Sequence, residues 1–371
     1  MNSERLSRIA KSVLPDIVIV LDCRCLAYEF RGIAQFTYSL AKALSTVQHI
    51  NLTLYCLCME GSNLVPCDRE QVVHLNAHNK DRLERIVREL NPTLFLVPSW
   101  FCKHCPVPKG LLPLTTPIVH DLIPCYLHRT SKRYLARLNL LSLTSRIYCV
   151  SNFTKGCLEK VKLNAEVIGV GTNQIAIPTS ASIASVLSKL RVRGKYVFCH
   201  TAYDVHKGLQ LLISEFLVLR NTSLQLVIGS KLPEKLARSI PTDAGIIVTG
   251  VLLETDKHAL YAGAWLVVSP SLMEGFGMPV ADALMLGKPT IVADNSNLRD
   301  LVTDSRFRFT HAGGSLSKLM YTLHTSEELY QECGAYAKAR KHSLLSWTDV
   351  VDNLLNWEVR RWKERKTISP A

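Results

Sequence analysis

Short apolar runs that alternate with segments of helical periodicity constrain this chain more than any other feature. A first series comprises residues 17–21, 35–44, 94–97, 118–119, 147–150 and 153–161. A second series comprises residues 196–199, 209–219, 224–228, 246–248, 265–268, 280–286 and 291–293. Strands and helices in alternation predict parallel sheets with right-handed crossovers. We therefore expect an α/β protein with two Rossmann-like, doubly wound domains that face a central cleft.

Two domains also agree with the length, because 371 residues exceed what one hydrophobic core usually supports. The pattern weakens at 172–193, which contains Pro178 and several serines and alanines, so we place the linker there. The expected domains are 1–172 and 173–345, followed by a final segment at 346–371. In open α/β sheets ligands bind beyond the carboxyl ends of the strands, so we expect the chemistry in those loops.

The charge balance indicates an anionic partner, because 44 lysines and arginines against 31 acidic residues give a net charge of +13. No zinc-finger, basic-zipper or RNA-recognition pattern is present, so we do not expect nucleic acid to be that partner. No apolar run reaches the roughly 18 residues that a membrane span needs. Pro15 and Asp16 interrupt the first apolar stretch, which argues against a signal peptide.

The twelve cysteines are spread from Cys23 to Cys333, too sparsely for a secreted disulfide scaffold. A reducing cytoplasm is therefore the expected location. Cys102 and Cys105 have the spacing of a metal or redox site, but no second ligand pair stands at a plausible distance. We interpret this segment as a loop with partly buried thiols, and we predict no metal site.

The segment from Glu274 to Asp282, EGFGMPVAD, has the features of a turn that binds anions and hydroxyl groups. It follows an apolar strand run, and Pro279 suits the first turn of a helix. Gly275 and Gly277 let the backbone approach a ligand closely. Free N–H groups at the start of a helix favour anionic or hydroxyl-rich groups. A nucleotide sugar offers both kinds of group.

This segment resembles the donor-binding signature of the family-4 retaining glycosyltransferases of the group 1 type, which have the GT-B fold. The family pattern has two glutamates around Gly-Phe-Gly, and here Asp282 replaces the second one. The resemblance implies that Glu274, Gly275, Phe276 and Gly277 hold the donor sugar and that Asp282 holds the ribose. Aspartate is one methylene shorter than glutamate, so the ribose contact is expected to be longer or altered.

Two segments of the first domain resemble the same family. Gly32 lies in RGIAQFTY, which is similar to the glycine-rich loop near the donor phosphates, with Ala34 in place of a usual glycine. His120 lies in IVHDLIP, which is similar to a segment of O-antigen and mannosyltransferase-like members. The resemblance implies that His120 orders the reacting centre. Asp121 either orients His120 or caps a turn.

The loop expected at the diphosphate departs most from the family pattern. Lys207, in CHTAYDVHKG, matches the family's lysine, whereas His206 and Thr201 stand where an arginine is usual. A histidine is only partly charged near neutral pH, so it holds a diphosphate less firmly than a guanidinium does. The resemblance implies catalytic roles for His120, Glu274 and Lys207, and it adds His206 and Gly32 to the residues that bind the donor.

The resemblance as a whole implies a metal-independent, retaining hexosyltransferase that needs no cofactor. It would move a sugar from a nucleoside-diphosphate sugar to a glycan or lipid-linked acceptor in polysaccharide or lipopolysaccharide biosynthesis. Domain 1–172 would be the acceptor side, domain 173–345 would bind the nucleotide sugar, and helix 346–371 would cross back to the first domain. Mannose from GDP-mannose is the first hypothesis for the donor, and UDP- and dTDP-sugars are the alternatives.

Basic segments at 128–134 and 357–366 bear on the acceptor and on location. The first suits a lipid diphosphate, and the second, which has two tryptophans, suits peripheral contact with an anionic membrane on its inner face. A solvated helix end is the alternative for the second segment. Two other functions stay open. One is a sugar-nucleotide epimerase on the same two-domain plan, and the other is a catalytically degenerate scaffold, motivated by Ala34, His206 and Asp282.

Overall fold

A computed structural model describes residues 16–28, 32–48, 50–62, 64, 66–68, 71–75, 80–127, 132–172, 175–219 and 222–368. The chain divides into two compact units, Met1–Gly171 with Leu345–Ala371, and Thr172–Leu344. The boundaries expected from the sequence, 172/173 and 345/346, each differ from these by one residue. The final helix belongs with the first unit.

The described part of the first unit is built on a seven-stranded parallel sheet in the order β3-β2-β1-β4-β5-β6-β7. The strands are β1 (Ile17–Asp22), β2 (Leu52–Met59), β3 (Val72–Leu75), β4 (Leu94–Val97), β5 (Thr115–Val119), β6 (Tyr148–Cys149) and β7 (Glu166–Val167). Every residue of β4 and β5 is buried, as expected for central strands that helices cover on both faces.

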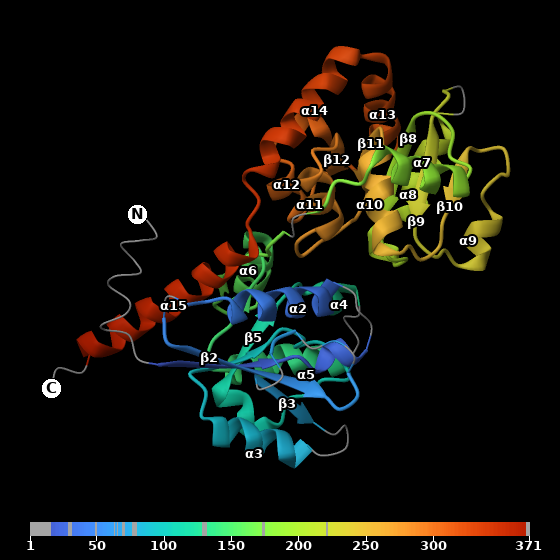
Figure 1. The fold of residues 1–371 in the computed structure, drawn as a ribbon. Helices are drawn as coiled ribbons and strands as arrows, with labels where there is room; N and C mark the ends of the chain where they lie inside the picture. The colour runs from blue at the N-terminus through green and yellow to red at the C-terminus, as the bar shows by residue number, and fades with distance from the viewer. Residues whose placement is uncertain are drawn as a thin grey trace. The chain divides into compact units, whose positions relative to one another are not determined.

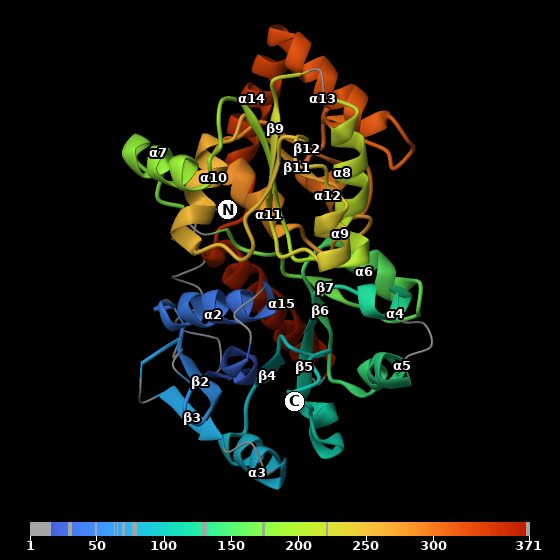
Figure 2. The ribbon, with the colours of Figure 1, turned by 90° about the vertical axis from the view of Figure 1, so that its right-hand side faces the viewer.

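The helices of the first unit connect these strands and cover the sheet. They are α2 (Gly32–Ser45), α3 (Lys80–Leu90), α4 (Ile123–Leu127), α5 (Lys132–Leu140), α6 (Asn152–Glu159) and α15 (Trp347–Ile368), with the 3₁₀ turns η1 (Arg24–Ala27), η3 (Lys109–Leu114) and η4 (Leu141–Leu143). Figures 1 and 2 show α2 and α3 on opposite sides of the sheet, and α15 packs against α2. Ser151 caps α6 as expected, since its Oγ accepts from the Thr154 N–H at 3.1 Å.

The second unit has a six-stranded parallel sheet among its described residues, in the order β10-β9-β8-β11-β12-β13. The strands are β8 (Tyr196–His200), β9 (Gln225–Gly229), β10 (Ile246–Val248), β11 (Leu266–Ser269), β12 (Thr290–Ala293) and β13 (Arg308–Phe309). The helices are α7 (Ser180–Lys189), α8 (Leu209–Leu217), α9 (Glu234–Arg238), α10 (Glu254–Gly263), α11 (Met278–Met285), α12 (Leu298–Leu301), α13 (Ser315–Thr325) and α14 (Glu327–Lys341), with 3₁₀ turns η5 (Val205–Lys207) and η6 (Ser305–Phe307). The expectation of two Rossmann-like α/β domains is confirmed.

The linker expected at 172–193 is wrong in its second half, because this part forms α7. The Oγ1 of Thr179 caps the helix by accepting from the Ser182 N–H at 3.2 Å. Apolar residues at 183, 186, 187 and 190 form a helical face, which the surrounding serines and alanines made hard to see. This face packs into the core beside Tyr196 and Tyr261, and Figure 2 shows α7 next to α10.

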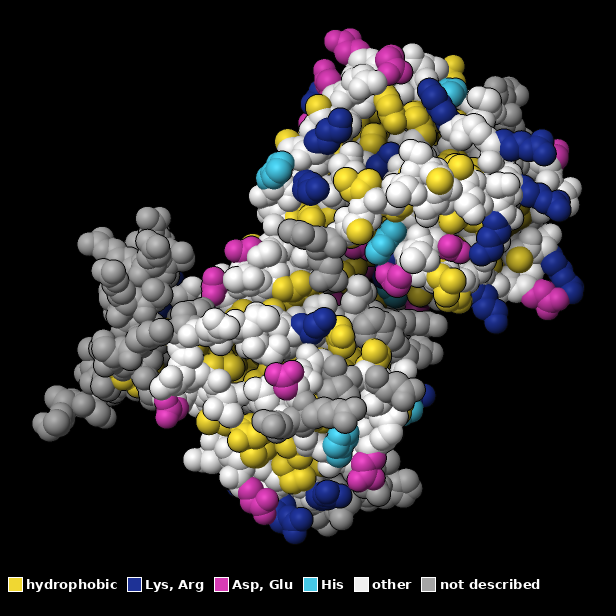
Figure 3. All heavy atoms as spheres, in the orientation of Figure 1, with side chains coloured by type: hydrophobic (Ala, Val, Ile, Leu, Met, Phe, Trp, Pro, Cys, Tyr) yellow, Lys and Arg dark blue, Asp and Glu magenta, His cyan; other side chains and the backbone are white. Residues whose placement is uncertain are grey.

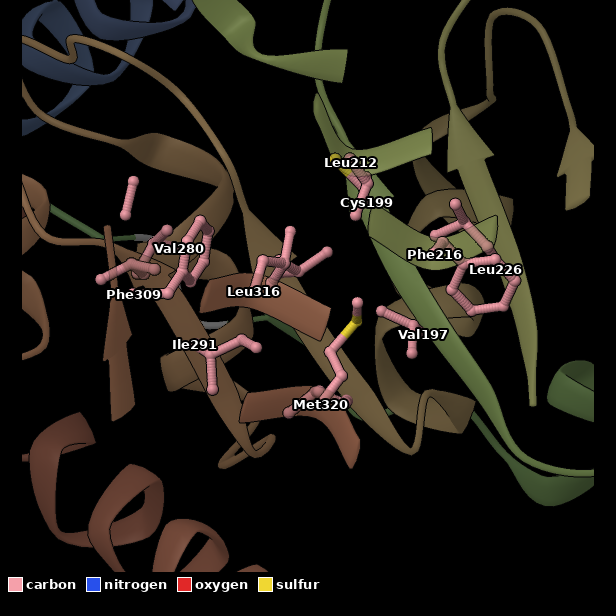
Figure 4. Close-up of a cluster of buried hydrophobic side chains, with 14 of the residues drawn as sticks. Val197, Cys199, Leu212, Phe216, Leu226, Val280, Ile291, Phe309, Leu316 and Met320 are labelled. Carbon is pink, nitrogen blue, oxygen red and sulfur yellow. The ribbon is translucent and has the colours of Figure 1, made fainter. Parts of the chain in front are cut away.

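The main core of the second unit lies between its sheet and the helices α8, α11 and α13. In Figure 4, Met320 of α13 lies between Ile291 of β12 and Val197 of β8, and Phe216 of α8 lies near Leu226 of β9. Helices far apart in sequence therefore pack on one sheet and fix the positions of the loops at its edge.

In the described part of the chain, no helix is long and apolar enough to cross a membrane. On the face drawn in Figure 3, lysine and arginine side chains lie interspersed with acidic and apolar ones. The excess of positive charge is therefore dispersed on that face.

Candidate active site

The strand order of the second unit shows where a ligand should bind. From β8 the chain continues outward to β9 and β10, and it then returns to β11 on the other side of β8. The carboxyl ends of β8 and β11 thus flank a topological switch point, where open α/β sheets bind their ligands. The loop after β8 carries His206 and Lys207, and the loop after β11 carries Glu274. Residues 67 positions apart in the sequence meet at this edge.

Lys207 and Glu274 form an ion pair at the switch point. The Lys207 Nζ lies 2.8 Å from Oε1 of Glu274, and the Ser271 Oγ donates to the same oxygen at 2.7 Å. The two charged side chains are largely shielded from solvent, with exposed fractions of 20% and 11%. A pair held this way fixes both groups, because each constrains the other and Ser271 constrains the carboxylate.

The polar loop after β12 is hydrogen-bonded to the segment that contains Glu274. The Glu274 N–H donates to the Ser296 Oγ at 3.0 Å, and Asn295 Nδ2 donates to the Ser271 carbonyl at 2.9 Å. Asn297 Nδ2 donates to the Phe276 carbonyl at 2.7 Å. These bonds hold the backbone of the loop that presents the carboxylate.

The sugar-binding segment leads directly into α11, which begins at Met278 with Pro279 in its first turn, as expected. Gly277 has φ +103, and an added Cβ would lie 3.0 Å from side chains of Leu298 and Leu301, so a larger residue would strain this turn. The Phe276 ring packs against the core of the second unit. The packing of the ring fixes the position of the backbone at Phe276, next to the two glycines.

His206 and Lys207 lie in the turn η5, before Gly208. The His206 ring is held by Asp204, whose Oδ1 lies 2.8 Å from Nδ1, and its carbonyl accepts from the Leu272 N–H at 2.7 Å. Gly208 has φ +67, and a Cβ there would lie 2.1 Å from the Pro270 carbonyl oxygen. The loops after β8 and β11 are thus in direct contact, and only glycine allows that approach.

Asp282, the residue expected at the ribose, lies on α11 and faces Lys257 of α10. The Lys257 Nζ lies 3.7 Å from a carboxylate oxygen of Asp282 and 2.7 Å from one of Glu254. Burial raises the pKa of Asp282 to about 6, although the Lys257 charge acts in the opposite direction. The Asp282 side chain keeps 18% of its surface exposed, so a ligand can still reach it.

In the first unit, His120 follows β5 and its ring packs against the Phe36 ring. The Phe36 ring lies edge-on to the His120 ring at 4.7 Å and to the Trp347 ring at 5.2 Å. Burial lowers the pKa of His120 to about 4, and its Nε2 has no hydrogen-bond partner within the described residues. The imidazole is therefore neutral near pH 7, and this nitrogen is buried without a partner among the described residues. Asp121 caps the next turn, as its Oδ1 accepts from the Ile123 N–H at 2.9 Å.

Gly32 is the first residue of α2, and an added Cβ there would meet no atom within 4 Å. Its environment is therefore open where the helix begins. Ala34 is buried in the same helix and packs inward. Arg31 and residues 128–131 of the basic segment at 128–134 lie outside the described residues.

Three features of this site were not expected from the sequence, namely Lys257, the hydrogen bond from Ser271 to Glu274, and the supporting loop at 295–297. Lys257 stands in an ordinary helical pattern, and nothing local indicates that it faces Asp282. The loop at 295–297 gave a usable signal, because its polar run follows directly after a buried strand. The loop at Cys102 to Cys105 is a turn after β4, and the described residues contain no group of three side chains suited to a metal.

The domain that carries Lys207, Glu274 and Asp282 is similar to a known protein family. Residues 194–325 match the model of the family described as Glycosyl transferases group 1, and they include Lys207, Glu274 and Asp282. Residues 194–325 of the second unit are therefore similar to a group 1 glycosyltransferase domain. The resemblance seen in EGFGMPVAD is thereby confirmed at the level of the family.

Relatives and solved structures extend the likeness beyond one domain. The serotype-specific mannosyltransferase WbdA of Escherichia coli is 25% identical over 315 residues, which cover 75% of this chain and 38% of WbdA. The chain thus spans about two fifths of that relative's length. The sucrose-phosphate synthase of Thermosynechococcus elongatus is 14% identical with a TM-score of 0.71, covering 94% of this chain and 99% of that one.

HepE of Anabaena, solved in complex with UDP and glucose, is 15% identical with a TM-score of 0.71, covering 93% of this chain and 100% of HepE. At such identities the two structures establish the fold alone. The chain has the GT-B fold expected from the sequence.

Proposed function

We propose that this protein transfers a sugar, with retention of its anomeric configuration, from a nucleoside-diphosphate sugar to a glycan or lipid-linked acceptor. The ion pair between Lys207 and Glu274 carries the proposal. Lys207 suits a diphosphate and Glu274 suits sugar hydroxyls, and their contact at 2.8 Å brings the two ligand parts to adjacent positions. A donor joins those parts by a single bond, the one that must break.

The proposed transfer uses the groups of this site together with the diphosphate of the donor itself. The bond between the sugar carbon C1 and the diphosphate oxygen breaks as a bond from the acceptor oxygen to C1 forms on the same face. The acceptor proton passes to the departing diphosphate. Lys207 and the N–H groups at the start of α11 stabilise the charge that develops on the leaving group. His120, being neutral, donates or accepts a hydrogen bond without adding charge, and we propose that no metal takes part.

Mannose from GDP-mannose is the donor we propose. The support is the 25% identity to the mannosyltransferase WbdA together with the IVHDLIP segment that contains His120. Polysaccharide or lipopolysaccharide synthesis is the corresponding process. Asp282, on α11, is the proposed ribose ligand.

Peripheral attachment to the inner, cytoplasmic face of a membrane is proposed for the acceptor step. The support is the net charge of +13 and the end of α15, where Arg360 stacks on Trp357 at 5.0 Å. An amphipathic helix end with tryptophan and arginine suits an anionic headgroup layer. A lipid-linked acceptor would be presented on that surface.

The test separates the sugar contact from the diphosphate contact. A thermal-shift screen with GDP, UDP and dTDP identifies the base, because a ligand that binds the folded state raises its apparent stability. The Glu274→Gln variant should still be stabilised against thermal unfolding by that nucleoside diphosphate. Its rate of diphosphate release from the sugar donor should be roughly 100-fold lower than that of the wild type. Lys207→Gln should lose the diphosphate shift. Wild-type release by Glu274→Gln would refute the assigned sugar contact.

The same assay separates the other functions. A sugar-nucleotide epimerase would convert the donor in the absence of any acceptor at its full rate. A scaffold without activity would show no stabilisation by any of the three nucleoside diphosphates. Either result would overturn the proposed transfer.

A further inference from the structure

A pocket of about 350 Å³ opens in the first unit, at the amino-terminal edge of its sheet. It is enclosed by the loop that leads into β6, by the turn that leads into β7, and by α15. Its lining includes three cationic side chains from these three segments, namely Arg146, Lys162 and Arg361. Gly32 and His120 lie at the carboxyl ends of strands of this unit, so this pocket is separate from the expected donor site.

The positive charge around this pocket is only partly neutralised. Arg146 is paired with the buried carboxylate of Glu358, and Lys155 lies 4.0 Å from Glu166. Neither Lys162 nor Arg361 has an ion-pair partner within the described residues. Four cations and two carboxylates leave a local charge of about +2, which is the charge that a phosphate monoester neutralises.

Arg146 provides a built polar group in the wall of this pocket. Its side chain is 9% exposed, and one terminal nitrogen donates to Glu358, which the Tyr148 hydroxyl also engages. The Arg146 Nε has no hydrogen-bond partner within the described residues. A buried guanidinium N–H without an acceptor lowers the stability of the folded protein. A small shift of the Arg146 side chain would let this N–H donate to an oxyanion in the pocket.

Lys162 occupies an unusual backbone position at the mouth of this pocket. It follows the end of α6 with φ +62, in the left-handed region where glycine is the residue without steric cost. The fold therefore holds a lysine where its backbone is strained. The pocket adds hydroxyl and amide groups from Ser142, Thr144 and Asn164, which suit the ester side of a phosphorylated ligand.

We propose that the pocket formed by Arg146, Lys162 and Arg361 binds a phosphate monoester. A volume of about 350 Å³ accommodates a phosphate with a small polar substituent. The phosphate comes either from a soluble ester or from a lipid headgroup, and both present the same dianion. This inference does not depend on the proposed transfer reaction, because it uses no residue of the donor site.

The test uses the whole protein with two probes and two matched variants. Glycerol 3-phosphate serves as the soluble monoester, and vesicles of phosphatidylcholine with phosphatidic acid serve as the lipid monoester. The first variant combines Lys162→Gln with Arg361→Gln and removes two cations of the pocket. The control combines Lys160→Gln with Lys109→Gln, which removes the same charge from exposed positions of the first unit outside the pocket lining and outside α15.

The wild type and the control should bind at least one probe equally well, and the pocket variant should bind it about tenfold more weakly. Binding of glycerol 3-phosphate identifies a soluble ester as the ligand, and selective binding of phosphatidic acid vesicles over phosphatidylserine vesicles identifies a lipid. Equal losses in both variants would show diffuse electrostatics and overturn the proposal, as would the absence of binding to both probes. Thermal unfolding without ligand verifies that both variants are folded, since the Arg146 to Glu358 pair is left intact.

Discussion

Lys257 of α10 lies 3.7 Å from Asp282 of α11 and joins the two helices through a buried charge. Lys257 is only 5% exposed, while its second partner, Glu254, is largely exposed. The lysine therefore partly compensates the carboxylate of Asp282, which is largely shielded from water. This contact determines both the stability of the second unit and the charge that a nucleotide ribose would meet.

Replacing Lys257 by Met should destabilise the second unit by about 3 kcal/mol, because it leaves the Asp282 carboxylate buried without a counter-charge. Urea unfolding followed by circular dichroism measures the change. The double variant Lys257→Met/Asp282→Asn should recover most of the loss, since it removes both charges together. A double variant whose change in stability equals the sum of the two single changes, measured at the same pH, would show that the two residues do not interact.

Asp282→Asn should change how stability depends on pH. Burial raises the pKa of Asp282 from its ordinary 3.8 to about 6, so the folded state favours the protonated acid. The stability that this group contributes is complete below pH 3.8 and is lost as the pH rises through 6. About two pKa units correspond to roughly 3 kcal/mol, so the Asn variant should exceed the wild type by up to this amount at pH 8.

In the Asp282→Asn variant Lys257 keeps Glu254, 2.7 Å away, so no uncompensated lysine offsets that gain. Thermal unfolding at a series of pH values between about 4 and 8 measures the difference between the variant and the wild type. An advantage of the variant that grew as the pH fell would contradict the assigned direction of the pKa shift.

Gly208→Ala should separate the loops after β8 and β11. The new methyl would lie 2.1 Å from the Pro270 carbonyl oxygen, and φ +67 adds backbone strain of about 1 kcal/mol. We expect a loss of more than about 2 kcal/mol in unfolding free energy, together with weaker binding of a nucleoside diphosphate near Lys207. Gly250→Ala is the matched control, because Gly250 has φ +76 and open space around it. Equal losses in the two variants would show that the contact with Pro270 has no effect.

His120 should remain neutral throughout the physiological pH range. Burial lowers its pKa to about 4, so an NMR titration of its ring should show a midpoint near that value. The pH profile of sugar transfer should then have no inflection from His120 near neutrality. His120→Ala should lower kcat roughly 100-fold without shifting the remaining inflections. A ring midpoint near 6.5 would contradict a buried, neutral imidazole.

Much of the fold was predictable because apolar periodicity is a local property of the chain. The runs at 17–21 and 94–97 became buried parallel strands, and residues 280–286 became part of α11. Prediction failed where the pattern was weak. The apolar face of α7 was hidden among serines, and β7 is a two-residue strand that exists only because β6 pairs with it.

The sequence by itself determined the candidate residues of the site, because glycines, a proline and acidic residues at fixed spacing are needed wherever a helix start approaches a sugar. Only the tertiary structure decided which of them touch. Lys207 meets Glu274 because β8 and β11 are neighbours in the sheet, and Asp282 meets Lys257 because α10 packs beside α11. Contacts between segments distant in the chain depend on strand order and helix packing, which local spacing does not encode.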